Sequence, residues 1–122
     1  MSSLRRRWKR LDKIVSMIGM ATKAGKTVSG EFMTEKAVKE GSACLVITAE
    51  DASENTKKLF YNMCSFYHVP FCVYGTKETL GHGMGKEMRA SLAVLDNGFC
   101  AAIVKRLKEC GSWDEKSNAE MR

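Results

Sequence analysis

Histidine is scarce in this sequence, and no cysteine lies where a metal site would need it. The chain of 122 residues contains two histidines, His68 and His82, and neither has a ligand-like spacing to a cysteine. A zinc site of cysteine and histidine is therefore not expected. No serine stands beside a general base, and no other pattern argues for catalysis, so we predict a non-enzymatic protein without metal or cofactor.

Long apolar runs are also missing. No stretch approaches the roughly 20 residues of a membrane-spanning helix, and no hydrophobic core follows the basic N-terminus. We therefore expect no membrane segment and a cytoplasmic location. The cysteines are odd in number and form no Cys-x-x-Cys motif, which predicts reduced and mostly buried thiols. They are Cys44, Cys64, Cys72, Cys100 and Cys110.

Both basic and acidic residues occur along the whole chain, but the net charge is unevenly distributed. Residues 1–40 hold ten basic and four acidic residues, whereas residues 41–122 hold ten of each, so the first segment carries the whole net charge of +6. A one-sided basic surface favours a polyanion such as nucleic acid. The length suits a single domain, with a predicted core at about 10–110, a basic arm at 1–10 and a loose tail at 111–122.

Helical periodicity alternates with short strands that are apolar throughout. Strands that are apolar on both faces need helices on both sides, which predicts a three-layer α/β/α sandwich. The predicted strands are 43–49, 71–74 and 90–95, and the predicted helices are 4–24, 53–67, 76–81 and 99–110. The helix at 53–67 is expected to bury Leu59, Met63 and Phe66, with Phe60 and Tyr67 alongside. The residues expected to face inward from the last helix are Phe99, Ile103, Leu107 and Cys110.

Residues 24–41 form the most informative stretch, a turn and very short strand followed by a helix between two glycines. Ser29 and Gly30 supply N-cap chemistry, and Gly41 suits a left-handed C-terminal cap. A helix that begins after Gly30 leaves its first N–H groups free for a phosphate. Phe32 and Lys36 share one helical face, an aromatic and a cation beside an anion site. The alternative is a surface helix with scattered lysines.

Two glycine motifs are rejected. Gly25-Lys26-Thr27 resembles the end of a phosphate-binding P-loop, but Met20 stands where the motif needs glycine, and a helix rather than a strand precedes it. The run Gly81-His82-Gly83-Met84-Gly85 follows a helix and misplaces the third glycine of a dinucleotide-binding loop. A helix C-cap and a flexible loop explain it better.

Several segments together resemble the L-seven-Ae ribosomal protein family, which includes the L-thirty-e proteins, and in particular its small bacterial YlxQ-type members. The resemblance covers about residues 12–107. It implies an α/β/α sandwich around a mixed four-stranded sheet, and binding of kink-turn or kink-turn-like RNA in a ribonucleoprotein. The matching segments are 21–31, 36–38, 45–58, 69–70 and 77–81.

The resemblance also implies where RNA binds. Family members use the N-terminus of the helix that begins here after Gly30, and the loop before the last strand. The basic residue matching Lys36 contacts RNA, and the loop covers a flipped-out nucleotide, a role for Met88 and Ala90 beside Arg89. The predicted RNA-binding residues are Lys23, Lys26, Ser29, Gly30, Glu31, Phe32, Met33, Lys36, Lys86, Met88, Arg89 and Ala90.

The sequence departs from the family at two of these positions. Archaeal members carry Asn-Glu two and three residues after the glycine and read tandem sheared G·A pairs with them. Here Phe32 and Met33 stand there, and neither reads a purine edge by hydrogen bonds. Lys36 and the phosphate site remain, and phosphate contacts carry much of the affinity for RNA.

We therefore predict a non-enzymatic, ribosomal-type protein that binds structured RNA as a monomer, with the ribosome as a candidate partner. The alternative is a protein-interaction module that kept the fold and lost specific RNA binding. In that case Phe32 and Met33 would form an apolar docking patch.

Overall fold

The computed structural model describes the backbone of residues 2–114 and the side chains of residues 13–114. The side chains of the predicted basic arm and residues 115–122 of the predicted tail lie outside the described residues. The elements in chain order are α1 (Ser2–Lys23), β1 (Thr27–Ser29), α2 (Glu31–Lys39), β2 (Leu45–Thr48), α3 (Glu54–Tyr67), β3 (Phe71–Val73), α4 (Lys77–Gly83), β4 (Ser91–Val94) and α5 (Asn97–Glu109).

The four strands form one mixed sheet in the order β1-β4-β2-β3. The central strand β4 runs antiparallel to both β1 and β2, whereas β2 and β3 are parallel. Both β2 and β4 are buried along their whole length. Successive side chains alternate between the two faces, so Val46 and Ala93 enter one core cluster and Ile47 and Leu92 enter the other.

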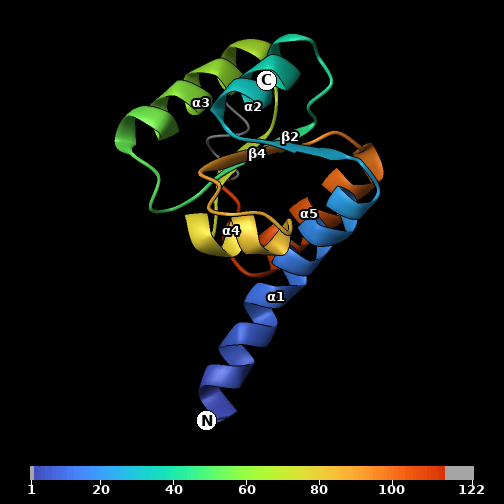
Figure 1. Ribbon diagram of the computed structural model, residues 1–122, viewed down its shortest axis with the longest axis vertical. Helices are drawn as coiled ribbons and strands as arrows, with labels where there is room; N and C mark the ends of the chain where they lie inside the picture. Colours follow the sequence, from blue (N-terminus) through green and yellow to red (C-terminus); the bar gives the residue numbers. More distant parts are fainter. Residues whose placement is uncertain (1, 115–122) are drawn as a thin grey trace.

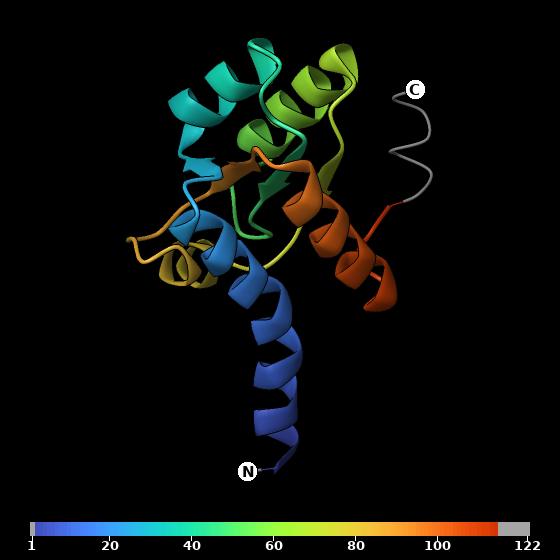
Figure 2. The same cartoon turned by 90° about the vertical axis from the view of Figure 1, so that its right-hand side faces the viewer.

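Helices cover both faces of the sheet, which confirms the predicted three-layer α/β/α sandwich. Figures 1 and 2 show α2 and α3 side by side over one face, and α1, α4 and α5 on the other. Below the first layer, Phe60 and Cys64 pack with Val46 and Ala93. The second layer encloses the larger cluster around Ile18, Leu80 and Ile103 among others.

The predicted inward face of α3 is wrong by about one residue. Phe60 and Cys64 are the buried residues of this helix, whereas Phe66 is 74% exposed and Leu59 is also exposed. The segment carries two overlapping apolar stripes, and adjacent residues differ by about 100° around a helix. Packing against β2 and β3 selects the stripe with Phe60.

The last helix begins two residues earlier than predicted, at Asn97, because the Asp96 carboxylate caps it by accepting from the backbone N–H of Phe99 at 3.0 Å. Ile103 and Leu107 are buried as expected, but Phe99 is only half-buried and Cys110 is exposed. Cys110 follows the final helical residue, so it has left the inward stripe.

The other cysteines agree with the prediction of buried thiols. Cys64, Cys72 and Cys100 are buried, Cys44 is half-buried, and all five thiols are free. Burial disfavours the thiolate and raises the pKa of Cys64 from 9.0 to about 12. The Cys64 thiol is therefore a small apolar core group at neutral pH.

Candidate nucleic-acid interface

Helix α2 begins directly at the end of β1. Gly30 joins the two with φ 89° and ψ 159°, a region that a residue with a Cβ rarely adopts. Its N–H donates to the Ser91 carbonyl at 2.9 Å, which fixes the start of α2 to the start of β4. No side chain within the described part of the chain caps this helix, so the first-turn N–H groups stay available to an anion.

Ser29 does not supply the N-cap that its position predicts. Its hydroxyl accepts a hydrogen bond from Nε of Arg89 at 3.0 Å, and Nη1 of Arg89 donates to the Met88 carbonyl at 3.0 Å. Residues 29 and 89 are 60 positions apart in the chain. The bond from Arg89 to Ser29 therefore joins the start of α2 to the loop before β4, the two segments in which the predicted RNA-binding residues lie.

That loop, residues 84–90, is folded back onto α4. Helix α4 starts with a reciprocal capping box between Thr76 and Thr79. The N–H of Lys86 donates to the Gly81 carbonyl at 2.8 Å, and the N–H of Arg89 donates to the Lys77 carbonyl at 3.0 Å. The loop is thus held at both ends by backbone bonds to a capped helix.

Gly81 permits this close approach. A Cβ on Gly81 would lie 1.8 Å from the carbonyl oxygen of Glu87, and one on Gly83 would lie 2.4 Å from Cγ1 of Val15 in α1. Both glycines belong to α4 rather than to a loop, which corrects the predicted end of this helix at Gly81. The glycines are used for packing, and the sequence pattern alone offered no signal for the contact with Glu87.

Exposed apolar side chains flank the joined segments. Phe32 is 76% exposed on the first turn of α2, and Met88 is 64% exposed in the loop, with Met33 also exposed. Phe32 and Lys36 line a depression of about 370 Å³ on the surface of α2, as their spacing of four residues predicts. We call Ser29, Gly30, Phe32, Lys36, Met88 and Arg89 the α2–loop surface.

The charges beside Phe32 are of two kinds. Lys39 pairs with Glu35 at 2.9 Å, and this hydrogen bond raises the pKa of the Lys39 ammonium. Lys36 is exposed and has no ion-pair partner among the described residues. Lys36 is therefore the lysine of α2 whose charge is open to a phosphate.

The remaining predicted site residues are less closely gathered. Lys23 and Lys26 are exposed at the other end of β1, where the N–H of Leu95 donates to the Lys26 carbonyl. The three-residue strand separates them from Gly30 by about 10 Å. Glu31 and Lys86 are exposed beside the α2–loop surface, and Ala90 is half-buried, its carbonyl accepting from the N–H of Ala49.

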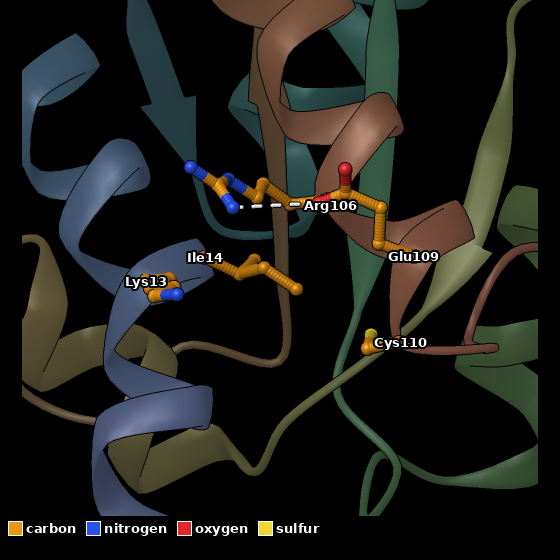
Figure 3. A pocket seen from close by; sticks show the side chains of 5 residues that line it. All are labelled: Lys13, Ile14, Arg106, Glu109 and Cys110. Carbon is orange, nitrogen blue, oxygen red and sulfur yellow. Dashed lines mark hydrogen bonds and ion pairs between the residues drawn. The ribbon is translucent and has the colours of Figure 1, made fainter.

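A second depression, of about 440 Å³, lies between α1 and α5 (Figure 3). Lys13 and Ile14 line it from α1, and Arg106, Glu109 and Cys110 line it from α5 and its end. Arg106 Nη1 lies 3.4 Å from Oε1 of Glu109. Among the described residues of its lining, no nucleophile is hydrogen-bonded to a general base.

Within residues 13–114, histidine, cysteine and acidic side chains form no group of three that could hold a metal ion. In the part of the chain that the structure describes, every helix is too short or too polar to cross a bilayer.

Comparison with protein families gives a match over residues 12–104 to the ribosomal protein L7Ae/L30e/S12e/Gadd45 family. Two proteins named RNA-binding protein YlxQ are similar in sequence. The one from Bacillus subtilis is 38% identical over 75% of this chain and 91% of its own length. The one from Enterococcus faecium is 36% identical over 80% of this chain and 89% of its own length.

Solved structures show the same fold. A protein of unknown function from Bacillus halodurans superposes with a TM-score of 0.76 and 34% identity, over 79% of this chain and 97% of that one. The 15.5kD RNA binding protein of Giardia lamblia superposes with a TM-score of 0.67 over 81% of this chain and 86% of that one. At 18% identity, this second likeness concerns the fold alone.

Proposed function

Because the chain belongs to the ribosomal protein L7Ae/L30e/S12e/Gadd45 family, we propose that it is a non-enzymatic RNA-binding protein that recognises structured RNA. The RNA is of the kink-turn or kink-turn-like kind, ribosomal or other, and is bound by a monomer in the cytoplasm. The observation that carries the proposal is the hydrogen bond from Arg89 to Ser29, which makes one surface of the start of α2 and the 84–90 loop.

Each part of the α2–loop surface has a role in this proposal. The uncapped first turn of α2 receives a phosphate, with Lys36 supplying a charge-assisted contact one turn later. Phe32 on α2 and Met88 in the loop are both exposed. Their apolar side chains stack on or cover unpaired bases, which tolerates base identity because every base has a π face.

Selectivity for a kink-turn over a duplex is therefore expected to be modest. A phenyl ring at position 32 offers no hydrogen-bond donor or acceptor to a purine edge. Sequence-specific recognition of RNA uses splayed bases that are stacked and hydrogen-bonded at their edges. Phe32 provides the first of these interactions and not the second.

The experiment is a titration of a standard kink-turn RNA and a matched duplex at low and high salt. Lys36→Ala should weaken binding by roughly five- to 150-fold, the equivalent of about 1–3 kcal/mol for a charge-assisted bond. Lys105→Ala is the matched control, since Lys105 is exposed on α5 in the opposite layer. Equal losses in the two variants would mean that binding is diffuse electrostatics without a site.

Position 32 tests the second half of the proposal. Phe32→Ala should weaken binding to both RNAs, and Phe32→Asn should recover part of the selectivity for the kink-turn because an amide can bond a base edge. Strong selectivity in the parent that survives Phe32→Ala would place the specificity elsewhere in the α2–loop surface.

A protein-interaction module is the second candidate, favoured by the exposed apolar side chains of Phe32, Met33 and Met88. Salt separates the two functions. RNA binding weakens steeply as salt is added, because the release of counterions from the RNA becomes less favourable, whereas an apolar protein contact hardly responds. Failure to bind any structured RNA at low salt would favour this alternative.

A further inference from the structure

Two cysteines that are 56 positions apart in the chain meet at the end of the sheet. Cys44 immediately precedes β2, and Cys100 lies in the first turn of α5. The thiol of Cys100 donates to Sγ of Cys44 at 2.8 Å. The thiol of Cys44 in turn lies 3.3 Å from the Val94 carbonyl oxygen. The two sulfur atoms are thus in direct contact, with a shared backbone acceptor beside them.

Backbone bonds fix the positions from which these side chains extend. The N–H of Cys44 donates to the Val94 carbonyl at 2.9 Å, which attaches the start of β2 to the end of β4. The Asp96 cap fixes the first turn of α5 just two residues after that strand. The contact between the sulfur atoms is therefore set by the sheet and by the helix start, and both thiols are pre-positioned.

We propose that Cys44 and Cys100 are a site of reversible thiol oxidation, at which a small disulfide such as oxidised glutathione closes a bond between them. A disulfide bond measures about 2.05 Å, so the sulfur atoms must approach by a further 0.8 Å or so. In the proposal, rotation of the two side chains supplies this movement while the strands stay in place.

The reaction proceeds by two exchanges. The thiolate of the half-buried Cys44 attacks one sulfur of the small disulfide, forms a mixed disulfide and expels a glutathione thiolate. The thiolate of Cys100 then attacks Sγ of Cys44 and expels the second glutathione thiolate. The two protein thiols give up two electrons and two protons, and the two released glutathione thiols carry them away.

The surroundings of Cys100 make the second exchange slow at neutral pH. Burial, the hydrogen bond to Cys44 and the nearby Asp96 carboxylate all raise the pKa of the Cys100 thiol. Because only the thiolate attacks, closure should accelerate as the pH rises. The exposed Cys110, whose thiol contacts the Leu107 carbonyl and Ser112 Oγ, serves as the comparison site within the same chain.

The experiment treats the full-length folded protein with oxidised glutathione at about pH 8.5, near the ordinary pKa of a thiol. Intact mass and a non-reducing digest are then measured. In the Cys110→Ser variant, which removes the exposed thiol, we expect the folded protein to lose the mass of two hydrogen atoms. In the parent we expect the same loss beside any glutathione adduct on Cys110, and in both a linked pair of peptides that contain Cys44 and Cys100. The melting temperature should rise by several degrees, since the bond closes a long loop of the unfolded chain.

Single-cysteine substitutions test that Cys44 attacks the small disulfide and that Cys100 then attacks Cys44. Cys100→Ser should trap a glutathione adduct on Cys44, Cys44→Ser should leave Cys100 unmodified, and Cys110→Ser should close the bond as the parent does. Circular dichroism confirms that each variant is folded. The proposal is overturned if the parent keeps a stable adduct on Cys44, if Cys44 does not react while Cys110 does, or if the linked peptides contain Cys110.

Discussion

Replacing Gly81 by alanine should displace the 84–90 loop. Its effect on RNA binding and its effect on the stability of the fold can be measured separately. The new Cβ would lie 1.8 Å from the Glu87 carbonyl oxygen, 2.6 Å from its carbon and 3.0 Å from the Cα of Met88. These are backbone atoms, so no rotamer change can relieve the contact. The loop must move by roughly 1.2 Å before even a tight contact of 3.0 Å is reached.

That movement is large for the bonds that hold the α2–loop surface together. The bond from Arg89 to Ser29 measures 3.0 Å, and a displacement of about 1 Å takes such a pair beyond hydrogen-bond distance. We expect a stability loss of about 1–3 kcal/mol from overpacking, offset by up to about 1 kcal/mol of alanine helix propensity. RNA affinity should fall by about tenfold, the lower range for a lost stacking contact.

Urea denaturation measures the first effect, and fluorescence anisotropy with a labelled kink-turn RNA measures the second. Gly19→Ala is the matched control, because its Cβ would lie 2.8 Å from the Gly83 carbonyl oxygen at the contact between α1 and α4. It should cost stability by pushing on the end of α4, while the contact between Gly81 and Glu87 stays as it is. If the two variants bind RNA equally well, the loop makes no contribution to binding, and an unchanged stability in Gly81→Ala would refute the packing argument itself.

Three further predictions concern the core. Phe60→Ala should cost about 3–5 kcal/mol in urea denaturation because Phe60 is fully buried, and Phe66→Ala less than about 0.5 kcal/mol; similar losses would contradict the observed face of α3. The Thr48 hydroxyl is buried without a hydrogen-bond partner in the described part of the chain, so Thr48→Val should raise stability by about 1 kcal/mol, and a loss would reveal a partner. Burial raises the pKa of Cys64 to about 12, so the thiol loses its proton at a lower pH in the unfolded chain than in the folded one. The contribution of Cys64 to the free energy of unfolding should therefore be fully present below about pH 9 and fall as the pH rises toward 12. Cys64→Ala should flatten that fall when unfolding is measured across the range, and an unchanged slope would assign it to other groups.

Local chemistry in the sequence was sufficient for most of the elements. The continuous apolar runs around Ile47 and Leu92 predicted buried strands, and Ser53 and Thr76 predicted helix starts that the structure confirms through their side-chain caps. Gly41 has the positive φ expected after a helix. Such signals act within a few residues of the chain, so they can be read without knowledge of the fold.

These local signals could not predict contacts between segments that are distant in the sequence. Two apolar stripes overlap in α3, and only its packing on the sheet decided that Phe60 rather than Phe66 is buried. The position of Ser29 predicts a helix cap, but its hydroxyl instead accepts a hydrogen bond from Arg89, which is distant in the sequence. Lys26 is near Gly30 in sequence, but the extended strand β1 carries it to the other end.

The candidate site shows the same division. Its parts could be named from the resemblance, because the helix start after Gly30 and the loop near Met88 each have a recognisable sequence. The two parts come together through the order of the strands, since β1 pairs with β4, which places Ser29 opposite Leu92 and bonds Gly30 to Ser91. The sequence by itself determined which segments are helix, strand and exposed loop, whereas pairing and packing across the sheet decided which side chains meet, because those energies arise between residues that only the folded chain brings into contact.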